Sequence, residues 1–258
     1  MTLTRDGLFH RQLTVLQPER GYRFAVDSVL LGTFSSTIRS EKCVDLGSGC
    51  GVVGFILLGR GKVQMVVGVE LDPVLASAAG EGARENAFQD RYRVIEGDLR
   101  EAGWREEVGR VGLVVSNPPY HVTGAGRSSP DEGRARGRHD ATCTLDDVLD
   151  AASSLLEPRG RFCVVLPPER MGEFLAGASD RGLFASRLRP VYPKPGRPSR
   201  MVLLEVRSGA DSSGLVLETP LLLHDAHGEY THEARDILAG KVPGSGLTGV
   251  DASHTEEP

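Results

Sequence analysis

Cysteine, aromatic residues and long apolar segments are all scarce in this sequence. Only 4 of its 258 residues are cysteine, and no two of them form a CxxC pair. We therefore expect buried, reduced thiols and no zinc site, and the seven scattered histidines suggest no other metal. No apolar run is long enough to span a membrane, and residues 1–11 contain no apolar signal core. These absences predict a cytoplasmic protein without a metal or a membrane partner.

An excess of positive charge is missing as well, because 30 Lys and Arg face 35 Asp and Glu, for a formal net charge of −5. This balance does not indicate a nucleic-acid-binding protein, but local clusters matter more than the total for a polyanionic partner. Two clusters are present. The first comprises Arg127, Arg134, Arg136, Arg138 and His139, and the second comprises Arg187, Arg189, Lys194, Arg197 and Arg200. Each is either a solvated surface or a site for phosphates.

The length and composition fit one soluble domain. With 40% hydrophobic and 25% charged residues, 258 residues can enclose a full core. We expect an N-terminal arm over residues 1–20, a globular domain over 21–240, and a disordered tail over 241–258 that is rich in Gly, Ser, Pro and acids. The pattern does not specify an oligomeric state.

Strand-like and helix-like segments alternate along the chain. Predicted strands cover residues 42–46, 65–70, 91–95, 111–116 and 161–166, with a helix before the first and helical patterns between most of the others. This alternation predicts an α/β fold, with a mostly parallel, doubly wound sheet that carries helices on both faces. Segments 184–192 and 200–206 have no helix between them, so they should add a C-terminal antiparallel hairpin and complete a seven-stranded sheet.

Three helix starts are marked by capping residues. Asp27 is predicted as the N-cap of the first helix, and Asp72 caps the helix that opens with Pro73. Thr144 and Asp147 form a candidate capping box.

A glycine-rich turn follows the first predicted strand of the sheet. In the segment Asp45-Leu46-Gly47-Ser48-Gly49-Cys50-Gly51, every second residue after Leu46 is glycine, which lets a ligand approach the backbone before a helix begins. Glu70 ends the second strand, where a carboxylate can accept both ribose hydroxyls of a nucleoside. Asp98 follows the third strand, where an acid can accept from an adenine amino group. These positions predict a nucleoside cofactor, although a nicotinamide dehydrogenase would share the same acids.

The end of the fourth strand distinguishes these readings. There the chain reads Ser116-Asn117-Pro118-Pro119-Tyr120, and the two prolines fix a rigid loop without backbone donors. The side-chain carbonyl of Asn117 and the backbone carbonyl of Pro118 can accept both hydrogens of an exocyclic NH2 group, while Tyr120 offers a flat face for stacking. We therefore predict a site for a planar amide or amine nitrogen, with a plain strand-ending turn as the alternative.

Taken together, these residues resemble class I methyltransferases that modify adenine amino groups or glutamine amides, and one subgroup most closely. The similarity extends from about Arg5 to Gly240. It includes the segments Gly21-Tyr22-Arg23-Phe24, Asp27-Ser28-Val29-Leu30-Leu31 and Gly228-Glu229-Tyr230-Thr231. The subgroup is the bacterial valine-tRNA adenine-N6 methyltransferases, which act on the adenine 3′ of the anticodon.

The resemblance implies S-adenosylmethionine as cofactor and tRNA as partner. It places Arg23, Phe24 and Asp27 at the methionine end of the cofactor, and it assigns further cofactor contacts to Asp45, Gly47, Gly49, Gly51, Glu70, Asp98 and Asn117. By the same resemblance Asn117, Pro118 and Tyr120 are the catalytic residues. The first arginine cluster would contact the RNA, because four arginines in twelve residues repel each other without a polyanion.

Other methyltransferases share parts of this pattern. Release-factor glutamine methyltransferases have a sizeable helical domain ahead of the glycine turn, whereas only 44 residues precede Asp45 here. A DNA adenine methyltransferase should carry a target-recognition domain, for which no segment is left, so we expect no DNA partner. A ribosomal RNA guanine-N2 methyltransferase stays open, and so does a non-catalytic RNA-binding module, although the presence of Glu70 and Asn117 does not support the latter.

Overall fold

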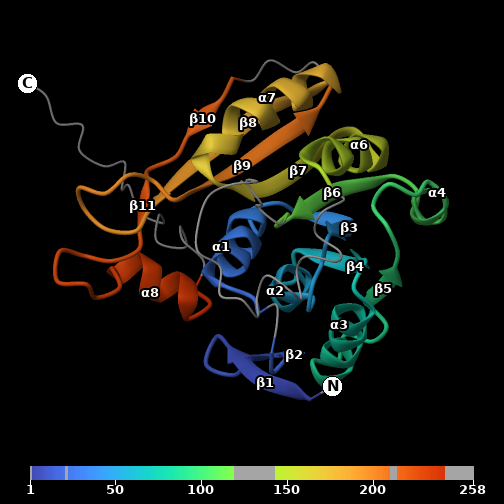
Figure 1. Cartoon of the computed structure of the whole chain (residues 1–258), viewed down its shortest axis with the longest axis horizontal. Coiled ribbons are helices and arrows are strands. Elements are labelled where there is room, and N and C mark those ends of the chain that lie inside the picture. The colour runs from blue at the N-terminus through green and yellow to red at the C-terminus, as the bar shows by residue number, and fades with distance from the viewer. Residues whose placement is uncertain (1, 21–22, 119–142, 210–213, 242–258) are drawn as a thin grey trace, which may run out of the picture.

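The computed structural model describes residues 2–20, 23–118, 143–209 and 214–241 (Figure 1). Tyr120, the first arginine cluster and the predicted tail beyond residue 241 lie outside these ranges.

Five parallel strands form the centre of the main sheet. They are β3 (Ser40–Leu46), β4 (Val63–Glu70), β5 (Tyr92–Glu96), β6 (Val111–Ser116) and β7 (Leu156–Leu166). Their spatial order is β5-β4-β3-β6-β7, so the chain starts in the middle of the sheet and winds outward in both directions. The predicted doubly wound sheet is confirmed, and its switch point lies between β3 and β6.

The predicted antiparallel hairpin is also confirmed. It consists of β8 (Leu183–Tyr192) and β9 (Met201–Ser208), and β9 inserts between β7 and β8, antiparallel to both. The main sheet therefore contains seven strands of five or more residues in the described part of the chain, as predicted. Two strands of two residues each, β10 (Val216–Leu217) and β11 (Leu221–Leu222), pair parallel to β8 and were too short to leave a sequence pattern.

Helices cover both faces of the sheet (Figure 1). One hydrophobic cluster joins one face to α1 (Val26–Ser35), α2 (Val52–Gly59), α3 (Pro73–Glu85) and α8 (His232–Leu238). The other joins the opposite face to α4 (Gly103–Val108), α6 (Leu145–Leu155) and α7 (Met171–Asp180), which follows the 3-10 turn η1 (Pro168–Arg170). Neighbouring strand residues face opposite ways: Cys43 packs in the first cluster and Val44 in the second.

Two of the three predicted helix caps are confirmed. The Asp72 carboxylate accepts a hydrogen bond from the Val74 N–H, and Thr144 and Asp147 form the reciprocal capping box. The prediction for Asp27 is wrong, because α1 begins at Val26 and Ala25 is its N-cap, two residues earlier than predicted. Asp27 lies in the first turn, and its carboxylate accepts from the Ser28 N–H at 2.7 Å instead.

The predicted N-terminal arm is a β-hairpin that belongs to the body of the protein. Strands β1 (Leu3–Leu8) and β2 (Leu13–Pro18) pair antiparallel, and Val15 is fully buried in the core that includes α3. Three consecutive turn residues, Phe9 to Arg11, have positive φ although none is glycine. The usual glycine or asparagine signal for such a turn is therefore missing.

No helix in the described part of the chain is long and apolar enough to cross a membrane.

Candidate active site

The predicted site residues lie along one edge of the sheet. Parallel register pairs Leu46 of β3 with Val69 of β4 and with Ser116 of β6, and it pairs Glu70 with Glu96 of β5. The glycine turn, Glu70, the segment after β5 and Asn117 therefore all leave the sheet at its carboxyl edge. This is where open α/β sheets bind ligands.

The glycine turn has the backbone conformation that the sequence predicted. Gly47, Gly49 and Gly51 have φ values of 68°, 55° and 83°, which residues other than glycine rarely adopt. Among the described residues other than its chain neighbours, no atom would lie within 4 Å of a Cβ at Gly47, so the backbone conformation accounts for the glycine there. At Gly51, the N-cap of α2, a Cβ would approach the Phe55 ring to 2.8 Å. The turn thus combines an unusual backbone with close packing at its base.

Glu70 fastens the glycine turn to β4. Its two carboxylate oxygens accept hydrogen bonds from the N–H groups of Gly49, at 2.7 Å, and Asp72, at 2.9 Å. Glu70 is only 9% exposed. Burial raises the pKa of Glu70, while these backbone hydrogen bonds oppose the shift. A carboxylate has about four acceptor sites, so each oxygen retains capacity for a further donor.

Asp45 lies beneath the turn with an unpaired oxygen. It is 1% exposed, and no hydrogen-bond donor among the described residues reaches its Oδ2. Burial, together with the smaller effect of the Glu70 charge, raises the pKa of Asp45 to about 7, against a hydrogen bond from the Gly54 backbone that lowers it. A buried acceptor without a partner suits an ordered water or a ligand donor such as an ammonium group.

Asp98 is already engaged by a neighbouring side chain. Both of its carboxylate oxygens accept hydrogen bonds from the Arg100 guanidinium, which holds the pKa of Asp98 below its usual value. An adenine amino group at this position would have to share the carboxylate or displace the exposed Arg100. The sequence did not indicate this pairing.

The segment that contains Arg23 and Phe24, expected at the methionine end of the cofactor, is bound to the N-terminal hairpin. The Arg23 guanidinium lies 2.9 Å from the Asp6 carboxylate, and the Phe24 N–H donates to the Gln17 side chain at 3.1 Å. Gln17, buried in β2, also donates to Asp6 at 2.7 Å. The positive charge of Arg23 acts on the buried Cys50 thiol of the glycine turn, whose pKa burial raises to about 12. The hairpin therefore positions Arg23 on the side of that turn.

Asn117 is oriented by a residue that the sequence analysis did not assign to the site. Its Nδ2 donates to the hydroxyl of Ser28 at 3.0 Å, and Ser28 is a buried residue of α1. Because the amide nitrogen faces Ser28, the amide carbonyl points the other way. Pro118 follows and is buried. The sequence did mark Ser28 as part of the motif Asp27-Ser28-Val29-Leu30-Leu31. It could not show that Ser28 contacts Asn117, because the two residues are 89 positions apart.

The remaining predicted site residues fall outside the described ranges. They are Tyr120 of the substrate motif and the RNA-contacting group Arg127, Arg134, Arg136, Arg138 and His139.

Comparison with known families agrees with this arrangement. The pattern that defines the methyltransferase small domain family matches residues 26–173, which is more than half of the chain and contains the glycine turn, Glu70 and Asn117. The chain belongs to the methyltransferase small domain family. It is accordingly an S-adenosylmethionine-dependent methyltransferase, as the resemblance implied.

Similar proteins within this family cover nearly the whole chain. A Porphyromonas gingivalis protein is 30% identical over 88% of this chain and 91% of its own length. A Dickeya chrysanthemi protein is 33% identical over 89% and 91%, respectively. Both are named tRNA1(Val) (adenine(37)-N6)-methyltransferase.

Solved structures agree on the fold of this methyltransferase. A predicted O-methyltransferase from Agrobacterium tumefaciens superposes with a TM-score of 0.66 at 23% identity, over 84% of this chain and 97% of its own. A Thermus thermophilus 16S rRNA N2 methyltransferase, in complex with AdoMet and guanosine, superposes with a TM-score of 0.56 at 19% identity. It covers 80% of this chain, which in turn spans half of that larger protein.

Proposed function

We propose that this methyltransferase transfers the methyl group of S-adenosylmethionine to the exocyclic N6 of adenine 37, next to the anticodon of a valine tRNA. Residues 21–240 would form the methyltransferase domain together with the N-terminal hairpin that packs into its core, and a tRNA substrate implies a cytoplasmic enzyme. The names of the relatives support the target. The observation that carries the chemistry is the Asn117 amide at the end of β6, held by Ser28 with its nitrogen turned inward.

The residues at the carboxyl edge fit the cofactor. When bound, S-adenosylmethionine supplies a methyl group activated by a positively charged sulfur, so no side-chain nucleophile is required. The spare acceptor capacity of Glu70 suits the ribose hydroxyls, and the glycine turn suits close backbone approach. Arg23, Phe24 and Asp27 would hold the methionine end, with the unpaired Asp45 oxygen available to a water or the ammonium group. Asp98 would reach the adenine only if it shares its carboxylate with Arg100.

On the acceptor side, Asn117 and Pro118 would bind the target nitrogen. The Asn117 side-chain carbonyl and the Pro118 backbone carbonyl can accept the two hydrogens of an exocyclic amine and reject a keto group. Their hydrogen bonds draw electron density toward a nitrogen whose lone pair is delocalised into the ring. The rate enhancement would come from alignment and from this electrostatic effect. We place Tyr120 against the plane of the flipped base and the arginines of the first cluster against phosphates.

One assay separates the enzyme classes. The protein is incubated with methyl-labelled cofactor and, in parallel, with bulk tRNA, ribosomal RNA and release factor. We expect label in tRNA only, and Asn117→Ala should lower the turnover by roughly 10²–10³ while cofactor affinity changes far less. Label in ribosomal RNA or in protein, with unmodified tRNA, would contradict the proposal.

A further inference from the structure

The turn between β8 and β9 carries three exposed cations at the carboxyl edge. β8 runs parallel to the central strands and ends at Tyr192, and β9 returns from Met201, so residues 193–200 project from the same edge as Asn117. Lys194, Arg197 and Arg200 are all exposed on this turn. The sheet order β8-β9-β7-β6 places them two to three strand spacings, or about 10–14 Å, from the end of β6.

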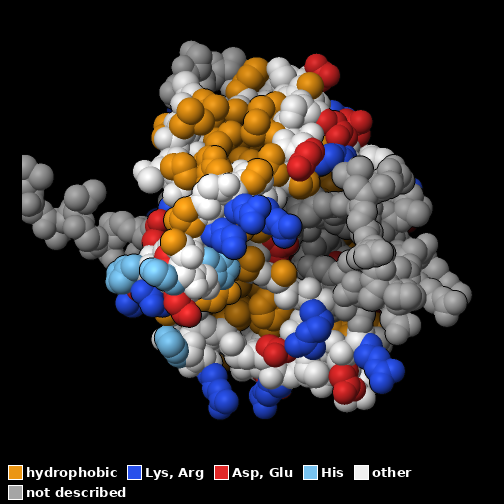
Figure 2. Space-filling model, turned by 60° about the vertical axis from the view of Figure 1, so that its left-hand side comes forward, with side chains coloured by type: hydrophobic (Ala, Val, Ile, Leu, Met, Phe, Trp, Pro, Cys, Tyr) orange, Lys and Arg blue, Asp and Glu red, His pale blue; other side chains and the backbone are white. Residues whose placement is uncertain are grey.

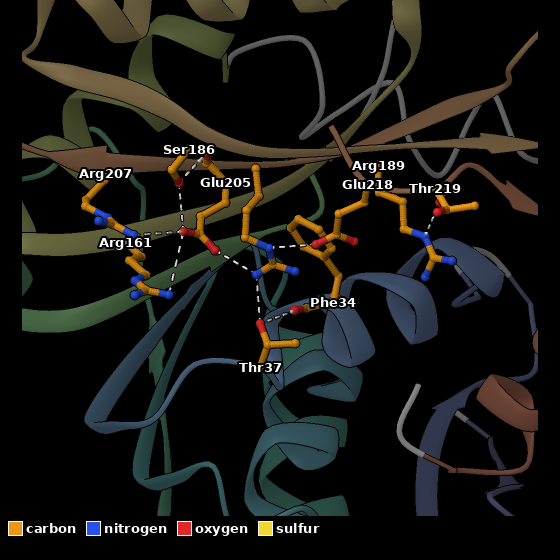
Figure 3. A network of polar contacts seen from close by, with 10 residues as sticks. Phe34, Thr37, Arg161, Ser186, Arg189, Glu205, Arg207, Glu218 and Thr219 are labelled. Atoms are coloured by element: carbon orange, nitrogen blue, oxygen red, sulfur yellow. Dashed lines mark hydrogen bonds and ion pairs between the residues drawn. The ribbon is translucent and has the colours of Figure 1, made fainter. Parts of the chain in front are cut away.

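These three cations differ from the two arginines that precede them in the sequence cluster. Arg187 pairs with Glu205 at 2.8 Å and with Glu218 at 2.7 Å, and its guanidinium lies over the Phe34 ring. Figure 3 labels both acids and Phe34 in this polar network. Arg189 pairs with Glu233. These two arginines therefore stabilise the fold.

By contrast, the side chains of Lys194, Arg197 and Arg200 make no hydrogen bond or ion pair with any described residue. Their charge is thus not neutralised by the part of the chain that the structure describes, although the protein as a whole is acidic. Uncompensated cations on a held turn suit an anionic partner.

The turn is held in place by its neighbours. The N–H of Arg200 donates to the Val191 carbonyl, and the N–H of His224 donates to the Pro193 carbonyl, both at 3.0 Å. The His224 ring nitrogen Nδ1 also lies 3.0 Å from the Pro193 oxygen. On its other side this ring stacks on Tyr230, at 4.5 Å between centroids and 25° between planes. The turn is therefore already ordered, and binding a partner should cost it little conformational entropy.

The cations and His224 line an open groove of about 760 Å³, which also contains Glu169. Figure 2 shows this side of the molecule, where Lys and Arg side chains gather close to histidines. Tyr230 stacks on the groove residue His224 and is 41% exposed, so part of its ring is accessible. Phosphate-binding cations beside an exposed aromatic ring are the combination that binds single-stranded nucleic acid.

We propose that this groove is a second contact site for the RNA strand whose target base enters at Asn117. Lys194, Arg197 and Arg200 bind phosphates a few nucleotides from that base, and Tyr230 stacks on an unpaired base. Glu169, which also lines the groove, repels phosphate from its vicinity and accepts a hydrogen bond from the amino group of a base. The proposal rests on the RNA substrate of the proposed function. It excludes duplex-only binding, since a paired base cannot stack on Tyr230.

The test compares two double variants that remove the same charge. Arg197→Ala/Arg200→Ala alters the groove, whereas Arg39→Ala/Arg84→Ala removes two exposed arginines elsewhere, one before β3 and one on α3. The dissociation constant for unmodified tRNA is measured between 50 and 200 mM salt. Each lost phosphate contact should lower the slope of log affinity against log salt by about 0.7–0.9. Over this fourfold salt range, the affinity of the wild type should therefore fall by about 2.6- to 3.5-fold more per contact, or about 7- to 12-fold more for two contacts, than the affinity of the groove double variant.

A second pair tests the ring. Tyr230→Ala should raise the KM for tRNA roughly five- to hundredfold without changing kcat at saturating tRNA, and Tyr230→Phe should behave like the wild type. Cofactor affinity should be unchanged in every variant. If the groove double variant matches the Arg39/Arg84 control while the wild type methylates tRNA, the groove is not a contact site and the proposed function stands. If the wild type methylates no tRNA, the proposed function itself fails.

Discussion

Replacing Ser28 by alanine should slow methyl transfer without weakening cofactor binding. The hydroxyl of Ser28 accepts the hydrogen bond that fixes the Asn117 amide, and without it the amide can rotate away from the orientation that presents its carbonyl to the substrate. A hydrogen bond of this kind contributes about 0.5–1.5 kcal/mol net, and each 1.36 kcal/mol is a factor of ten in rate. Ser28→Ala should therefore lower kcat by about two- to twelvefold.

The assay is steady-state methylation of tRNA, with kcat and both KM values determined separately. Ser35 supplies a matched control, because it is a buried serine of the same helix and lies seven residues, or about 10 Å along the helix axis, from Ser28. Ser35→Ala should leave kcat near the wild-type value, and Ser28→Thr, which retains a hydroxyl, should restore most of the activity lost in Ser28→Ala. Equal effects of Ser28→Ala and Ser35→Ala, or a change confined to the KM for the cofactor, would refute the positioning role.

Three further outcomes follow from the site. Glu70→Ala should weaken cofactor binding by about ten- to hundredfold in calorimetry, since hydrogen bonds to a charged group contribute about 1.5–3 kcal/mol; unchanged affinity in a folded variant would contradict the assignment. The native pKa of Asp45, about 7, lies above its ordinary value of 3.8, so its proton stabilises the cofactor-free fold at low pH and up to about 4 kcal/mol of stability is lost as pH rises from 4 to 7. Asp45→Asn should thus raise the Tm relative to wild type by clearly more at pH 8 than at pH 4, and an equal difference at both pH values would be inconsistent with this. Replacing Arg134, Arg136 and Arg138 together by Ala should flatten the salt dependence of tRNA binding while cofactor affinity stays constant; an unflattened slope would mean that this loop only faces solvent.

The sequence predicted the sheet and the ends of its strands because local chemistry marks both. Apolar runs delimit the strands. Glycine, acid and proline residues mark the points where strands become loops, so Gly47, Glu70 and Asn117 were placed correctly at the carboxyl edge. Capping chemistry is equally local, which is why Asp72 was identified. Asp27 shows the limit, since an acid in a first turn has the same sequence signature as a cap.

The missed features depend on contacts between distant segments. The hairpin turn from Phe9 uses positive φ at residues that seldom adopt it, and the packing of β2 against α3 supports that conformation. The contact of Ser28 with Asn117 became apparent only in the folded structure, where α1 lies next to the end of β6. Likewise, the sequence does not distinguish the five cations of the second cluster. In the structure, Arg187 and Arg189 form ion pairs with acids, whereas the other three are exposed. Such assignments require tertiary structure.

The most direct test of the account is the identity and position of the methylated nucleoside. Purified valine tRNA, unmodified at position 37, is incubated with the protein and S-adenosylmethionine, digested to nucleosides and analysed by mass spectrometry, alongside a transcript that carries guanine in place of adenine 37. We expect N6-methyladenosine in the first RNA and no methylation of the second. N2-methylguanosine in either RNA, or equal methylation of both transcripts, would contradict it.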